Sequence, residues 1–172
     1  INYGGIQAIQ TLWAGPWMLN ITGYTPLESA TGLFWINITM LISYFIWGYI
    51  LPKISEYGVS SVKLIILFLR ISYFSLFIII YFGNNSGAFL FTIYIVTSIV
   101  ISLTQPAIAL NFSKNLAGKS LTSYNVFLFS GTFFIQWGIG LVIDFCSNRG
   151  FDVLSSYRIS FSLFLILCVM SY

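Results

Sequence analysis

Polar side chains recur at helical spacing inside apolar stretches of this chain, beginning near its N-terminus. Gln7, Gln10 and Thr11 fall within about 100° of one another around a helix. Trp17 lies close to the same face, and Pro16 is expected to bend the helix near its outer end. Long amides beside a bend suit a wet cavity that hydrogen-bonds a polar solute. They equally suit hydrogen bonds between helices, worth about 0.6–2 kcal/mol, and both interpretations stay open.

A second polar stripe lies closer to the C-terminus. Asn125, Phe129, Thr132, Gln136 and Gly140 are spaced four, three, four and four residues apart, so they share one helical face. The ring of Phe129 lies between polar members of this stripe, where it could stack on a substrate or only fill space. The stripe therefore predicts a second wall for the same cavity.

A third stripe consists mainly of small residues. Ser98, Ser102, Gln105 and Ala109 share a face, and Pro106 follows Gln105 directly. Gln105 is a further candidate for the cavity, and Pro106 is a second candidate for a helix bend. Small residues also allow two helices to pack closely, so this stripe favours a cavity and close packing equally.

Arg70 is the one basic residue well inside an apolar stretch. It follows Lys63 by seven residues, which is about 10 Å along a helix. Its long side chain could extend back to lipid headgroups, form a structural pair, or contact a substrate or a proton.

Several kinds of chemistry lack the residues they require. The chain contains no histidine, which excludes a serine–histidine dyad and axial histidine ligands. Asp144 ends a predicted helix and Asp152 lies in a link, so no carboxylate pair is expected within an apolar stretch. Cys146 and Cys168 lack the spacing of metal ligands. We therefore expect neither an enzyme nor a bound cofactor or metal.

The elements that carry these stripes are predicted to be membrane-spanning helices. The chain is 58% hydrophobic and only 6% charged, far from the quarter charged residues of a typical soluble domain. Stretches of about 20 apolar residues match the hydrocarbon layer of a bilayer, and they are too long for barrel strands. The six predicted helices span residues 4–21, 30–51, 64–82, 88–110, 124–143 and 159–172, the last one truncated.

The sparse charges predict the orientation of the chain and exclude one class of partner. The second and fourth links carry four lysines, whereas the other side carries two arginines beside two aspartates. Basic residues favour the cytoplasmic side, so we expect the N-terminus of the chain in the cytoplasm. A net charge of +3 from seven basic residues is too little for a nucleic-acid interface. The chain starts without Met and stops in an apolar run, so we expect a fragment of a longer protein.

Three segments resemble the C-terminal half of bacterial major facilitator superfamily transporters. Residues 10–17 (QTLWAGPW) resemble the start of their seventh helix, and residues 106–125 and 134–144 resemble their tenth and eleventh helices. The resemblance implies an all-α bundle of six helices, numbered seven to twelve, with an inverted three-plus-three repeat. It also implies an N-terminal half of the same polypeptide as partner.

The family's cytoplasmic loop motif has only a partial counterpart here. Gly48, Lys53 and Gly58 occupy its glycine and basic positions, but Pro52 replaces the acidic residue. Because proline carries no charge, this loop lacks the acidic group on which the family's charge relay depends.

The resemblance implies a secondary transporter of the bacterial inner membrane that moves a small polar solute by alternating access. Residues of the first and fourth helices, and of the second and fifth, would line the cavity. Gln7, Gln10, Gln105 and Gln136 fall on such helices, and Pro16 and Pro106 would be the bends that let them move. Coupling to protons stays open. The alternative is a membrane scaffold or assembly subunit whose polar stripes only join helices.

Overall fold

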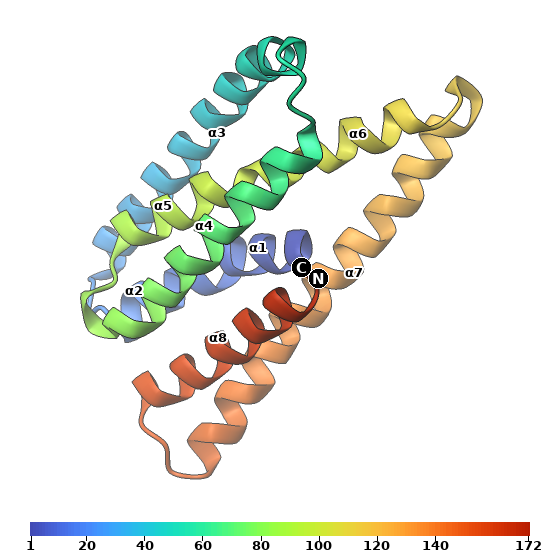
Figure 1. The fold of residues 1–172 in the computed structure, drawn as a ribbon. Helices are drawn as coiled ribbons and strands as arrows, with labels where there is room; N and C mark the ends of the chain where they lie inside the picture. The colour runs from blue at the N-terminus through green and yellow to red at the C-terminus, as the bar shows by residue number, and fades with distance from the viewer.

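The computed structural model describes the backbone of residues 1–172 and every side chain except those of Ser55 and Lys114. The described backbone consists of helices joined by short links (Figure 1). In chain order these are α1 (Asn2–Ala8), η1 (Ile9–Trp13), α2 (Ala14–Asn20), α3 (Pro26–Glu56), α4 (Ser61–Phe82), η2 (Gly83–Asn85), α5 (Ala88–Ser98), η3 (Ile99–Leu103), α6 (Thr104–Asn111), α7 (Lys114–Asn148) and α8 (Val153–Met170). They form six rods, because α1, η1 and α2 are continuous, as are α5, η3 and α6.

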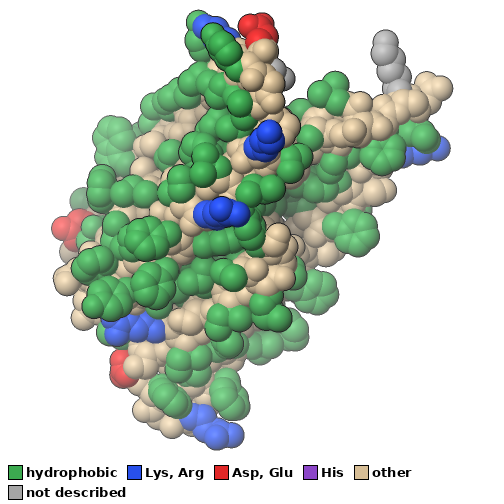
Figure 2. All heavy atoms as spheres, in the orientation of Figure 1, with side chains coloured by type: hydrophobic (Ala, Val, Ile, Leu, Met, Phe, Trp, Pro, Cys, Tyr) green, Lys and Arg blue, Asp and Glu red, His purple; other side chains and the backbone are tan. Residues whose placement is uncertain are grey.

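Five stretches are long and apolar enough to cross a membrane: Pro26–Ile54, Ser61–Asn85, Ala88–Asn111, Asn115–Asn148 and Val153–Met170. Figure 2 shows hydrophobic side chains over most of the visible face, with few charged ones. Phe45, Phe74 and Phe127 are among the exposed rings, at 72%, 63% and 79% of their full area. Water would not stabilise so much apolar surface, whereas lipid would.

Several helices are longer than the sequence predicts. Helix α3 begins at Pro26 because the carboxylate of Glu28 accepts hydrogen bonds from the backbone N–H and the hydroxyl of Thr25, at 2.8 and 2.9 Å. The backbone N–H of Glu28 donates to the Thr25 hydroxyl in return, which completes a capping box. At its other end α3 continues through Pro52 to Glu56, where a link was expected.

Helices α7 and α8 also differ from the predicted bounds. Helix α7 starts ten residues before the expected residue 124 and covers 35 residues, about 52 Å at 1.5 Å per residue. Helix α8 starts at Val153 rather than residue 159, because Asp152 caps it by accepting a hydrogen bond from the backbone N–H of Ser155 at 3.1 Å. The hydrogen bonds from Ser155 lower the pKa of the Asp152 carboxyl. Polar and charged residues near these helix ends therefore do not end the helix, which continues beyond its apolar part.

Both prolines predicted as bends follow a non-α segment. Segment η1 is a five-residue π-helix that begins seven residues before Pro16, and η3 is a five-residue 3₁₀-helix that begins seven residues before Pro106. Proline cannot donate a backbone hydrogen bond, and its ring clashes with the carbonyl four residues earlier. A change in helix width relieves that clash. The two interruptions therefore fall at matching places in the first and fourth rods.

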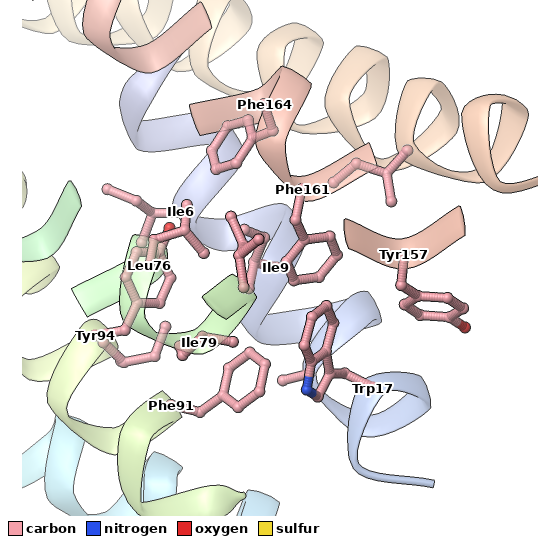
Figure 3. Close-up of a cluster of buried hydrophobic side chains, with 14 of the residues drawn as sticks. Ile6, Ile9, Trp17, Leu76, Ile79, Phe91, Tyr94, Tyr157, Phe161 and Phe164 are labelled. Atoms are coloured by element: carbon pink, nitrogen blue, oxygen red, sulfur yellow. The ribbon is translucent and has the colours of Figure 1, made fainter. Parts of the chain in front are cut away.

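The main core lies where the first rod, α4, α5 and α8 meet (Figure 3). Trp17, Phe91 and Phe161 are fully buried there. The Trp17 ring lies 4.7 Å from the Phe161 ring, centroid to centroid, and its Nε1 donates to Ser86 Oγ at 2.8 Å. A buried indole needs such a partner, so Trp17 anchors the first rod against the α4–α5 link.

The rods pack in pairs that the chain order does not make obvious. Helix α1 packs on α7, α3 on α5, and α4 on both α5 and α8, while α2 also meets α8. If the first three rods are exchanged with the last three, the pair of α4 and α8 is converted into itself and each other pair into another pair of this set. The exchange is incomplete, because α7 packs closely along α8, whereas α3 and α4 pack mainly on α5 and meet each other mainly through side chains such as Trp47 and Phe68, whose ring centroids lie 5.1 Å apart.

Candidate functional site

Four polar side chains from three rods form a row that we call the amide row: Asn37 of α3, Gln10 and Thr11 of η1, and Gln136 of α7. Gln10 Nε2 donates to Asn37 Oδ1 at 3.1 Å, and Gln136 Nε2 donates to Thr11 Oγ1 at 3.0 Å. The Thr11 hydroxyl donates in turn to the backbone carbonyl of Gln7 at 2.7 Å. Of the predicted residues, Gln10 and Gln136 belong to this row, and Gln7 contacts it through its backbone carbonyl only.

The π-helical segment η1 positions the centre of this row. Gln10 and Thr11 both belong to it. The indole of Trp13, at its end, donates to the backbone carbonyl of Gln136 at 3.2 Å and so joins η1 to α7. Segments of π-helix are rare and occur frequently at functional sites.

The amide row lies at the surface of the bundle and not in its interior. Thr11 and Asn37 are exposed, while Gln7, Gln10 and Gln136 are partly buried. Polar groups are costly in hydrocarbon unless they pair or face a cavity, and this row keeps unused donors and acceptors. This face therefore differs from the phenylalanine-rich surfaces elsewhere on the bundle and is better suited to contact with water or other protein than with lipid.

Two hollows lie on either side of η1. One has a volume of about 270 Å³ and is lined by Gln7, Gln10 and Asn37 together with Tyr3 and Tyr44. The other has a volume of about 350 Å³ and lies between η1 and α7. Both sizes match a small solute. Each hollow combines apolar walls with a few polar groups, which is the usual composition of a small-molecule site.

The second hollow continues the polar stripe of α7. Its lining includes Leu12 of η1 and, along α7, Gln136, Trp137, Gly140 and Asp144. Asp144 lies within α7, because the helix continues to Asn148.

The remaining residues predicted for the cavity lie elsewhere. Trp17 is in the core, and Gln105, Asn125 and Phe129 line neither of the two hollows beside η1. Gln105 and Asn125 are partly buried on α6 and α7, and Phe129 is 65% exposed. The amide row thus includes Gln10 of the first rod and Gln136 of the fifth, but not Gln105 of the fourth.

The stripe of mainly small residues on the fourth rod contacts α4 at Ser98. Ser98 is fully buried, and its hydroxyl shares a hydrogen bond with the Ser72 hydroxyl of α4 while donating to the carbonyl of Tyr94. This geometry favours the packing interpretation for Ser98.

Sequence reasoning missed Asn37, Tyr3 and Tyr44 as lining residues. Asn37 carries the same signal as the glutamines, since it is a polar residue inside a predicted membrane span. The tyrosines carry no such signal, because tyrosine is equally common in cores and at membrane interfaces.

The loop motif and Arg70 have local partners. Gly48 lies within α3, and Gly58 adopts a φ of +77° in the turn after it. Lys53 Nζ donates to Tyr49 Oη at 2.7 Å and lies 4.0 Å from the centre of its ring. Arg70 Nε donates to Tyr172 Oη at 2.7 Å.

Among the described residues, no group of three or more histidine, cysteine, aspartate or glutamate side chains could hold a metal ion. Comparisons with protein-family models, curated proteins and solved structures find no match to this chain.

Proposed function

We propose that this chain is the C-terminal half of a major facilitator superfamily permease. In this proposal it lies in the bacterial inner membrane with the N-terminus of the chain in the cytoplasm. It packs against an N-terminal half of the same polypeptide and moves a small polar solute by alternating access. The amide row carries this proposal, because a hydrogen-bonded polar surface on an otherwise lipid-compatible bundle needs an aqueous or protein neighbour.

The arrangement of the rods supports the same proposal. An inverted repeat predicts that exchange of the first and second triplets of helices preserves the packing pairs, and most pairs follow that rule. It also predicts that a feature near one end of the first rod recurs near the opposite membrane face in the fourth. The π-helical segment before Pro16 and the 3₁₀-helical segment before Pro106 start at the same distance from their prolines, which supports a relationship between the first and fourth rods.

A membrane scaffold is the second candidate. The hydrogen bonds within the amide row themselves favour it, because they join α3, η1 and α7 as glue would. The two functions differ in what the loss of a row amide should do. A transporter loses flux, whereas a scaffold loses assembly with its partner.

The test replaces Gln10 and Gln136 singly by Leu in the full-length protein, with Thr92→Val as the control. The Thr92 hydroxyl bonds only to Ala88 O of its own helix, so it takes no part in the row. Uptake of radiolabelled solutes by cells at matched expression should fall at least about tenfold in both Leu variants, the equivalent of 1.4 kcal/mol, and persist in the control. Uptake that survives both Leu changes would exclude the proposed cavity. Intact uptake with loss of a membrane complex on native gels would identify a scaffold.

A further inference from the structure

Asp144 shares a hollow with a member of the amide row. It follows Gln136 by eight residues and Gly140 by four, so the three lie along one face of α7, about 12 Å from end to end. All three line the hollow of about 350 Å³ beside η1. A solute long enough to span this hollow would therefore contact both the amide of Gln136 and the carboxylate of Asp144, and a shorter cation would contact Asp144 alone.

The charge in this hollow is negative. Asp144 is the one charged residue among its described lining residues. It also lies near the C-terminal end of α7, where the helix dipole is itself negative, and the last turn of α7 carries no basic residue. Arg149 is engaged elsewhere, with its guanidinium 4.9 Å from the centre of the Phe145 ring. The Asp144 carboxylate is therefore the feature of this hollow that would attract a cation.

Aromatic rings complete the wall. Phe133 and Trp137 line the same hollow and remain 61% and 57% exposed, so their faces are available. Ring faces attract cations, and an ammonium group over tryptophan is the strongest such pair. Phe133 also makes an edge contact with Phe134, at 5.7 Å between ring centroids. A carboxylate beside the exposed indole of Trp137 is a combination that favours organic cations over neutral or anionic solutes.

We infer that the solute of this permease carries an ammonium group, which Asp144 and Trp137 bind while Gln136 hydrogen-bonds a polar part of the same molecule. This inference rests on the proposed transport function and adds a substrate class to it. Protonated amines and quaternary ammonium compounds both meet the requirement, since each offers a compact positive charge.

The test measures binding of radiolabelled choline to the purified full-length protein, with 3,3-dimethylbutan-1-ol as a neutral competitor of the same shape. Choline should bind saturably, and the neutral alcohol should not displace it. Asp144→Asn keeps the shape but removes the charge, and it should weaken choline binding at least about tenfold. Asp144→Glu should retain binding. Trp137→Leu should weaken it about three- to tenfold.

Asp152→Asn is the matched control. Asp152 is an exposed carboxylate outside the hollow, and asparagine caps a helix as well as aspartate does. Binding should be unchanged in this variant. Elution of each variant as wild type on size exclusion separates a lost site from a lost fold.

Three results would overturn the inference. These are no saturable choline binding, equal binding by Asp144→Asn and wild type, or displacement of choline by the neutral alcohol. The proposed transport function stands separately, because flux of a neutral or anionic solute that depends on Gln10 and Gln136 would support it while excluding the cation site.

Discussion

Gln136 Nε2 of α7 donates to Thr11 Oγ1 of η1 at 3.0 Å, across 125 positions of sequence. This hydrogen bond joins the first and fifth rods on the surface of the bundle that carries the amide row. It forms next to a crossing of unusual closeness between the same two rods, where α1 packs on α7. The site and the packing that positions it can therefore be tested separately.

The crossing depends on Gly4. A Cβ at this position would lie 2.5 Å from the backbone N of Thr132 and 2.8 Å from the carbonyl O of Leu128. Backbone atoms cannot move aside as side chains can, so Gly4→Ala should push α1 away from α7. We expect a loss of about 1–3 kcal/mol of stability, as in other overpacked sites, measured as a lower thermal midpoint of the purified protein.

Gly138→Ala is the control for that change. Nothing lies within 4 Å of the Cβ that it adds to α7, and alanine favours a helix over glycine by about 0.5–1 kcal/mol. Its midpoint should stay level or rise. A Gly4→Ala protein as stable as Gly138→Ala would show that α1 and α7 do not cross as described.

Trp17 is expected to serve stability and not solute binding. Trp17→Phe removes the donor to Ser86 Oγ and part of a fully buried ring, so unfolding should become easier by about 1–3 kcal/mol. The apparent KM for uptake by the folded protein should stay near that of wild type. Trp35→Phe, at a site 59% exposed, should change neither quantity. A raised KM without a loss of stability would show that Trp17 binds the solute instead of stabilising the core.

Arg158 satisfies the C-terminal end of α4. Its Nε donates to the carbonyl of Ile80 at 2.9 Å and its Nη2 to that of Tyr81 at 2.8 Å. Arg158→Ala should leave both carbonyls without this partner and cost about 1–3 kcal/mol. Arg149→Ala, which removes only an exposed stack on Phe145, is the control. Equal thermal midpoints for the two variants would contradict the capping role of Arg158.

Helical periodicity in the sequence predicts much of the fold and part of the site. The apolar stretches locate all six rods, and the spacing of Gln7 and Gln10 places both at one hollow. The start of α3 was also readable, since Thr25 and Glu28 have the spacing of a capping box, but the prediction placed it four residues late. Helix ends are harder to predict because the polar residues that mark links also occur in helices that project beyond the apolar layer.

Trp17 shows why the rest of the site was not predictable. Its placement beside Gln7 and Gln10 assumed an uninterrupted α-helix of 100° per residue. The π-helical segment η1, which contains Gln10 and lies between Gln7 and Trp17, holds an additional residue in its wider turn. Residues after η1 are therefore rotated away from the predicted face, and Trp17 lies in the core. Periodicity also cannot identify which rods meet, so Asn37 could not be paired with Gln10 from the sequence.

The most direct test of the central claim is the accessibility of Gln136 to water. Gln136→Cys is introduced into a cysteine-free full-length protein, in which Cys146 and Cys168, both buried, are replaced by Ser. Phe127 is 79% exposed and lies about 180° around α7 from Gln136, so Phe127→Cys serves as the control that is expected to face lipid. If the amide row lines a solute pathway, a charged, membrane-impermeant thiol reagent should label Cys at 136 but not at 127, and substrate should slow that labelling. Equal protection of both positions, with or without substrate, would contradict a transport pathway along this face.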